Sequence, residues 1–322
     1  MNRSPGIKKR EWRHFVVLLL AAFPWLSMAQ MTVHGDDEDY TYESREGIEF
    51  GINIGAYRGD QLSPYFYDGS GDRTLAEGSG NAQIWSIQER LEQLQSQQLT
   101  HPVTGILNEY PAWQLESLPL MQYRTSMMFG LKMAKYWNPE TALVCQLDAV
   151  QMTAEGAWNL STGLLPDQGQ GNADIRTYPI LGKEQRMLVS LGYRTAIYLA
   201  EDASWTVEFG GMANATSVEE NYIVVTPDVG NAMYEVNLLT SVGNGNGQLT
   251  PANKLLTQWG TGFYASGGID LAFDEGGHTE LNARVSRDQI NLGTQTVQGW
   301  NVALFVTWMM PSELGDFVRA SF

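Results

Sequence analysis

Few residues of this chain could act as catalysts. Beyond its first 29 residues the chain has three histidines, His34, His101 and His278, and its one cysteine is Cys145. Covalent catalysis needs a nucleophile and a base within hydrogen-bond reach of each other. No Ser, His and Asp are grouped at the ends of the predicted strands, so we expect no catalytic residues and no enzymatic activity.

Two short motifs resemble ligand-binding loops but lack their context. The acidic run at residues 36–39 has neither the spacing nor the glycine of a calcium-binding loop, and we interpret it as a solvated linker. The glycine-rich run at residues 243–247 does not follow the strand of a strand–helix unit, which indicates a loop tip and not a phosphate site. We therefore predict neither a metal nor a cofactor.

Eight charged residues occupy alternate positions in stretches that are otherwise apolar or aromatic. They are four cations and four anions: Lys132, Arg186, Arg194 and Arg284, with Asp148, Glu208, Asp270 and Glu280. Balanced charges that face a narrow interior must pair with each other to offset their desolvation. We interpret these residues as a structural charge network, with a conduction path as the alternative.

The elements that carry these charges are eight segments that alternate with a period of two and are rich in aromatic and β-branched residues, as β-strands are. They are residues 47–58, 123–137, 141–155, 185–199, 204–216, 260–274, 278–291 and 297–310. Tight turns alternate with long connections at residues 59–122, 156–184 and 217–259. This asymmetry is typical of outer-membrane β-barrels. A soluble up-and-down barrel would have the same number of strands and is the alternative.

The last segment indicates which face meets lipid. Trp300, Val302, Leu304, Val306 and Trp308 share one side, with a tryptophan near each end, as in the aromatic girdles of membrane barrels. Side chains just fill an eight-stranded barrel. The predicted fold is therefore an all-β, eight-stranded antiparallel up-and-down transmembrane β-barrel with long extracellular loops, one of which contains an amphipathic helix.

The N-terminus is predicted to be a secretory signal peptide. Five Lys and Arg precede the apolar run of residues 15–26, and Ser27-Met28-Ala29 forms a cleavage site. A helical membrane span needs about 20 apolar residues, so this run is too short for one. We assign residues 1–29 to the signal peptide, 30–46 to an acidic linker and 47–322 to the barrel. Cleavage removes five cations and one anion, which changes the formal charge from −16 to −20 and makes nucleic acid an unexpected partner.

In its strand arrangement and in residues 48–55 and 188–193, the chain resembles small eight-stranded outer-membrane β-barrel proteins, the opacity- and porin-like class, in a form common in Bacteroidota. The resemblance spans residues 47–310 and implies a place in the cell envelope of a Gram-negative bacterium. Such proteins usually end on an aromatic residue that closes the last strand. Here Pro311 follows Met310 and the chain ends at Phe322, so the assembly signal is either Phe322 or the region of Trp308.

One apolar stripe in the first long connection indicates a helix. Ile84, Ile87, Leu91 and Leu94 recur at helical spacing, which predicts an amphipathic helix over residues 81–98. The connection has 64 residues, and connections this long tend to be functional. The stripe either caps the mouth of the barrel or binds another protein, so these four residues are candidates for partner binding.

These features predict a non-enzymatic outer-membrane protein, a structural or protein-binding component of an outer-membrane assembly that acts through its long loops. The expected partners are outer-membrane lipid and another outer-membrane or surface protein. Two alternatives remain open. One is a lipid-modifying enzyme, for which the resemblance implies a histidine near the outer rim, where only His101 could lie. The other is a small porin-like channel.

Overall fold

The computed structural model describes residues 47–71, 82–96, 102–110, 112–163, 174–200, 202–226, 232–241, 250–251, 257–273, 277–293 and 295–310. All of them belong to one compact unit, Ser44–Phe322. The predicted signal peptide and acidic linker lie outside the described residues, as do His101 and Phe322.

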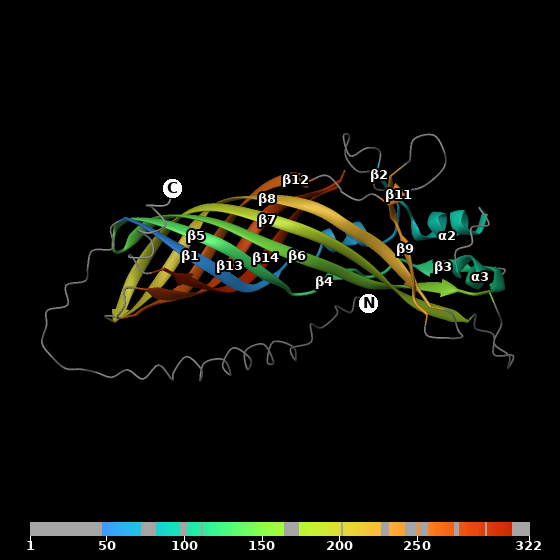
Figure 1. Ribbon diagram of the computed structural model, residues 1–322, viewed down its shortest axis with the longest axis horizontal. Helices are drawn as coiled ribbons and strands as arrows, with labels where there is room; N and C mark the ends of the chain where they lie inside the picture. The colour runs from blue at the N-terminus through green and yellow to red at the C-terminus, as the bar shows by residue number, and fades with distance from the viewer. Residues whose placement is uncertain are drawn as a thin grey trace, which may run out of the picture. The chain divides into compact units, whose positions relative to one another are not determined.

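Eight long antiparallel strands form the barrel (Figure 1). They are β1 (Gly47–Arg58), β5 (Ser126–Asn138), β6 (Thr141–Ser161), β7 (Ile175–Ala200), β8 (Ala203–Val225), β12 (Thr257–Ala272), β13 (His278–Leu292) and β14 (Gln295–Met309). Each strand pairs with the next along the chain, and β14 pairs with β1, for example through Ile54 and Val306. Every predicted strand corresponds to one of these elements.

Shorter strands add to this arrangement. β3 (Gln114–Ser117), β4 (Gln122–Tyr123) and β9 (Tyr234–Asn237) join the edges of longer strands and bring the sheet to 11 strands. A separate sheet of three strands consists of β2 (Ala82–Ile84), β10 (Leu239–Ser241) and β11 (Thr250–Pro251). The prediction of eight strands thus describes the barrel and omits these short additions.

Alternation along each strand separates an apolar outside from a polar inside. On β7, Met187, Val189 and Leu191 are exposed, whereas Arg186 and Ser190 are buried. On β14, Trp300, Val302, Val306 and Trp308 are exposed, as the predicted lipid face requires. The predicted outward direction of these residues is confirmed, because the period of two directs successive side chains to opposite sides of a strand.

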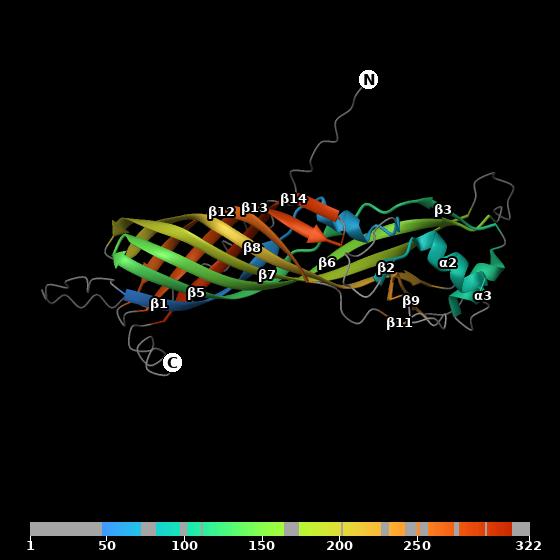
Figure 2. The same cartoon turned by 90° about the horizontal axis from the view of Figure 1, so that it is seen from above.

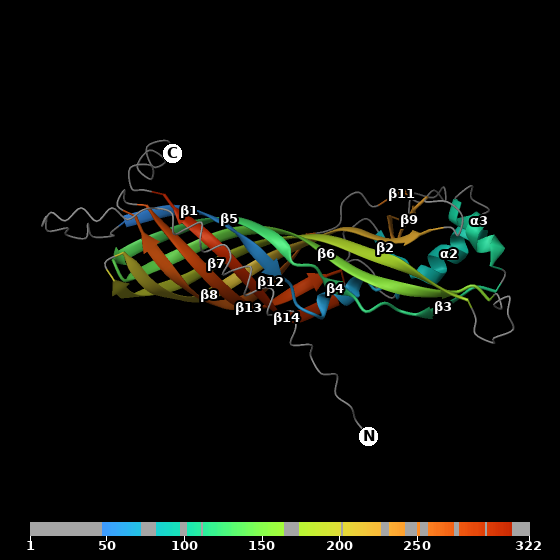
Figure 3. The ribbon, with the colours of Figure 1, turned by 90° about the horizontal axis from the view of Figure 1, so that it is seen from below.

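Strands β6, β7 and β8 are longer than predicted. They continue beyond the apolar exterior of the barrel, and there Gln151, Gln185 and Glu219 face outward. Figures 2 and 3 show helices α2 (Ile87–Ser96) and α3 (Pro102–Glu109) beside this extension. We call the extension of β6–β8, with the short strands and the two helices, the head. The inner face of these strands carries apolar residues that pack against the helices.

The head has a continuous apolar core. Trp158 and Ile180 of the extended strands are buried together with Ile87, Leu91 and Leu107 of the two helices. Gly69, at a φ of 75°, lies so close to Ile87 that a Cβ there would be 2.4 Å from its side chain. The amide of Ile87 also donates to the carbonyl of Gly69 at 2.9 Å. These contacts hold the start of α2 against the sheet.

Helix α2 is shorter than the predicted helix, because residues 82–84 form a strand and Ser86 caps the helix. The Ser86 hydroxyl accepts the Glu89 amide at 3.0 Å and donates to the Glu89 carboxylate at 2.9 Å. The Ser86 amide donates to the same carboxylate at 3.3 Å. This reciprocal capping box satisfies amides that would otherwise lack partners at the first turn. The predicted start at residue 81 is therefore wrong.

Three of the four candidate partner-binding residues lie inside the molecule and not on its surface. Ile87, Leu91 and Leu94 are buried in the head core, and Ile84 lies on β2, where its side chain is outside the described part. The apolar stripe thus meets the chain's own sheet, because burying it there removes it from water. It does not form an exposed docking surface. Neither described helix is long and apolar enough to cross a membrane.

Replacing Leu91 with Ala is expected to destabilise the head by about 2–5 kcal/mol, because a buried leucine leaves a cavity. Hydrogen exchange of the head amides should accelerate while heat-modifiable migration of the barrel on gels stays unchanged. The matched control is Glu92→Ala, one residue along on the exposed face. Equal exchange in both variants would contradict the assignment of Leu91 to the core.

Candidate functional site in the barrel interior

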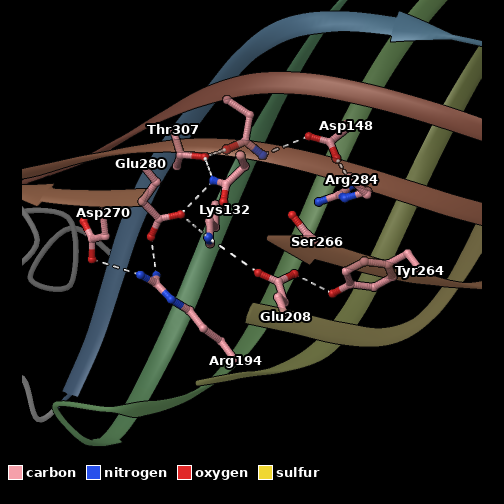
Figure 4. Close-up of polar contacts among 12 residues, drawn as sticks. Lys132, Asp148, Arg194, Glu208, Tyr264, Ser266, Asp270, Glu280, Arg284 and Thr307 are labelled. Atoms are coloured by element: carbon pink, nitrogen blue, oxygen red, sulfur yellow. Dashed lines mark hydrogen bonds and ion pairs between the residues drawn. The ribbon is translucent and has the colours of Figure 1, made fainter. Parts of the chain in front are cut away.

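A charge network fills the half of the barrel near the short turns (Figure 4). Arg194 of β7 donates to Asp270 at 2.9 Å, to the Tyr136 hydroxyl at 2.8 Å and to Glu280. Lys132 of β5 contacts Glu280 at 2.5 Å and Glu208 at 3.7 Å. All five charged side chains are buried. The pairs compensate charges that would be costly alone in a low-dielectric interior.

The network continues toward the middle of the barrel. Tyr264 donates to Glu208 at 2.6 Å, and the Arg284 guanidinium lies 4.9 Å from the centre of the Tyr264 ring. Arg284 also pairs with Asp148 at 3.0 Å, and Asn53 donates to Asp148 at 2.9 Å. The contacts of Tyr264 join neighbouring strands, whereas those of Asp148 with Arg284 and Asn53 join strands that are not neighbours in the sheet.

A glycine provides the space for part of this network. A Cβ on Gly130 would lie 1.9 Å from Oδ1 of Asp148, the oxygen that Asn53 contacts. Any larger residue at position 130 would displace the carboxylate. Gly130 on β5 thus leaves space for the Asp148 carboxylate on the neighbouring strand β6.

His278 is the member of the network that lies nearest the short turns. Its Nδ1 lies 2.6 Å from Asp270 and its Nε2 lies 2.9 Å from Glu49. Ligand atoms of Asp270, His278 and Glu280 come within 4.8 Å of one another, a spacing compatible with a metal ion. Both carboxylates already bind the Arg194 guanidinium, whose charge repels a cation. The geometry therefore favours the ion pairs over a metal.

A second network lies at the long-loop end, around Arg186. Its guanidinium contacts Glu184 at 2.6 Å, the Ser63 hydroxyl at 3.1 Å and the Tyr123 hydroxyl at 3.2 Å. Asp60 lies 4.0 Å away. Ser63 begins the short helix η1 (Ser63–Tyr67), so this network ties the segment after β1 to the mouth of the barrel.

Two tyrosines support Glu184 in this second network. The hydroxyls of Tyr67 and Tyr123 donate to its Oε2 at 2.7 and 2.9 Å. Burial, and then the Glu184 carboxylate, raises the pKa of both tyrosines well above the usual value. Both hydroxyls therefore stay protonated and remain hydrogen-bond donors at any physiological pH.

The structure divides the eight candidate charges into two groups. Seven meet in the first network, whereas Arg186 belongs to the second, with Glu184 and Asp60. The sequence analysis missed Glu184, although it shares the phase of Arg186 two residues away. It also missed Asp60 and Tyr67, which come from the connection after β1, where no period of two applies. It missed Tyr123 because the predicted strand 123–137 is interrupted at residues 124–125, so that its alternation does not extend to Tyr123.

The described residues show how the interior charges are used. Both ring nitrogens of His278 contact carboxylates, so within the described ranges this histidine has no free nitrogen to activate a nucleophile. The contacts join strands to one another and give each buried carboxylate of the first network a cationic partner.

Comparisons with known proteins assign no family. No family model and no curated protein match the chain. Among solved structures, the attachment invasion locus protein of Yersinia pestis is 10% identical, with 82% of this chain and 99% of that chain covered and a TM-score of 0.31. Neisserial surface protein A is 8% identical, with coverages of 82% and 99% and a TM-score of 0.35. The outer membrane protein OprG from Pseudomonas aeruginosa is 9% identical, with coverages of 83% and 97% and a TM-score of 0.32. Similarity at this level assigns no function.

Replacing Arg194 with Met is expected to destabilise the barrel by about 3–5 kcal/mol, because it leaves Asp270 and Glu280 buried without their main cation. Urea unfolding of the reconstituted protein measures this change. Lys135→Met removes a cation from the exposed face of β5 and should change stability by less than about 0.5 kcal/mol. A similar small effect for Arg194→Met would show that the network does not stabilise the barrel.

Proposed function

We propose that this chain is a non-enzymatic outer-membrane protein in which a closed barrel anchors a folded head that serves as a structural or protein-binding element. The observation that carries the proposal is the reversal of polarity between the two faces of the barrel. Leu131, Val189 and Phe209 are exposed on its outside, while Lys132, Arg194 and Glu208 are buried within. Water would penalise such an exterior, whereas a lipid bilayer favours it.

The dimensions of the apolar surface support a membrane location. On β14 the exposed apolar residues run from Trp300 to Trp308. Eight residue steps rise about 27 Å along a strand, or about 20 Å along the membrane normal at the usual tilt. The apolar band of outer-membrane barrels is about 25 Å tall and bounded by aromatic residues. Trp137 and Trp205 are likewise exposed at the short-turn end, and Trp259 at the other.

The interior supports an anchor and not a pore. Arg194, Lys132 and their carboxylate partners occupy the lumen of a barrel that is just wide enough for side chains. Near the mouth, η1 is held by Arg186 and Glu184 through Ser63 and Tyr67. An ion that crossed would have to displace paired charges at both levels.

The head supports a binding role because it is a folded element with a buried apolar core. Its helices and extended strands bury residues such as Trp158 and Leu107. On its surface, Leu120 is 81% exposed and Met233 is 74% exposed. A rigid framework that presents apolar side chains beyond the membrane is the arrangement a protein-binding module needs.

The anchor proposal predicts that the detergent-extracted protein migrates differently on gels before and after heating, and that it passes no measurable current in planar bilayers. The double variant Lys132→Ala and Glu280→Ala removes a matched pair from the lumen and serves as the positive control for detecting a widened path. Large ion currents through the wild type would refute the anchor and support a porin-like channel. Recovery of the wild type in the soluble fraction without detergent would refute the membrane location.

The binding role predicts that a photo-crosslinking amino acid at Leu120 or Met233 captures a protein of discrete mass in intact cells. The matched control is Glu140, an exposed residue of the β5–β6 turn at the opposite end of the barrel. Adducts from the head and none from the turn are the expected result. Adducts of equal yield at all three positions, or at none, would contradict a head that binds a partner.

A further inference from the structure

Among the described residues of the barrel strands, two cations near the long-loop end form no ion pair, unlike the cations close to them. Arg124 pairs with Glu155, Arg176 with Asp174 at 2.9 Å, and Lys183 with Glu220 at 2.6 Å. Arg58 of β1 and Arg287 of β13 are exposed, and neither forms an ion pair with any residue in the described ranges.

Arg58 and Arg287 flank the same tryptophan. β14 lies between β1 and β13, where Arg58 is paired with Val302 and Arg287 with Trp300. Crossing two strands and moving two residues along them separates the Cα atoms by about 12 Å. Two arginine side chains can reach a common anion across that gap. The Arg287 guanidinium lies 5.6 Å from the centre of the Trp300 ring, and this stacking favours an outward position for it.

These arginines lie at the edge of the apolar exterior. From Arg58 and Arg287 toward the short turns, the outward residues are apolar, among them Val285, Val302 and Val306. Phe263 meets the Trp300 ring edge-on at 6.3 Å between centroids. A bilayer that covers this surface ends near the arginines, which places them at the level of lipid headgroups.

We propose that Arg58 and Arg287 bind the phosphate of an anionic lipid in the leaflet at the long-loop end, with the lipid's acyl chains on the apolar surface of β13 and β14. Guanidinium groups suit this ligand because their planar donors match phosphate oxygens. A lipid explains why two cations adjoin an apolar surface better than free phosphate does, because a lipid has both a phosphate and acyl chains. The inference rests on the proposed membrane location.

The test is native mass spectrometry of the full chain in a maltoside detergent, titrated with lipid A that carries two phosphates. The wild type should retain one lipid A. The double variant Arg58→Gln and Arg287→Gln should bind it about 25-fold more weakly, since each cation near a charged lipid surface contributes about five-fold. Arg58→Lys with Arg287→Lys keeps the charges and should recover part of the affinity. Arg176→Gln, which removes a cation already paired with Asp174, should bind as the wild type does.

Three results would overturn the inference: equal affinity in the wild type and the double glutamine variant, equal binding of lipid A after removal of its phosphates, or displacement of lipid A by excess inorganic phosphate. The last would identify a site for the free anion. Heat-modifiable migration of every variant is measured in parallel. A wild type that is not membrane-inserted contradicts the proposed function, whereas an inserted wild type with unaltered binding in the double variant contradicts the lipid site alone.

Discussion

The structure depends on the pairing of buried charges across the lumen. Because the apolar face of each strand points outward, the interior cannot be an ordinary hydrophobic core. Lys132 and Glu280 meet at 2.5 Å although β1 and β14 separate their strands in the sheet. Backbone hydrogen bonds join only neighbouring strands, so such contacts are what connect strands across the barrel. An uncompensated charge at any of these positions would cost more than the pair contributes.

The same logic applies at the mouth of the barrel, where charge pairing holds a connection in place. Arg186 and Glu184 of β7 bind Ser63, Tyr67 and Tyr123, which come from the segments between β1 and β5. The long first connection is therefore tied to the barrel before it enters the head. Strand β7 thus contacts three environments. In the barrel its apolar residues face outward and its charged residues face the lumen, and in the head its inner face joins the apolar core.

On the outside of the barrel, the types of residue change in a regular order along the strands. Apolar residues of β14 lie between Trp308 and Trp300, and on the flanking strands Arg58 lies opposite Val302 and Arg287 opposite Trp300. Aromatic side chains with one polar edge suit the boundary between hydrocarbon and headgroups, and arginines suit the headgroup region itself. The charges of the lumen form ion pairs with one another. Arg58 and Arg287 at the rim form no ion pair within the described ranges and are exposed to the surroundings of the barrel.

The sequence by itself determined the strands of the barrel and the face that each residue occupies. Alternation is a local property, so Trp300 and Val302 could be placed outside and Lys132 and Arg194 inside from spacing alone. Only the tertiary structure decided which charges meet. The register between β13 and β14, and between β14 and β1, helps to bring Glu280 to Lys132. Arg186 lies nearer the long-loop end and is separated from the other seven candidate charges. The burial of Ile87 and Leu91 was likewise decided by tertiary contacts, because an apolar stripe specifies that a helix needs a partner surface but not which surface provides it. Here the extended strands β6–β8 of the same chain provide that surface.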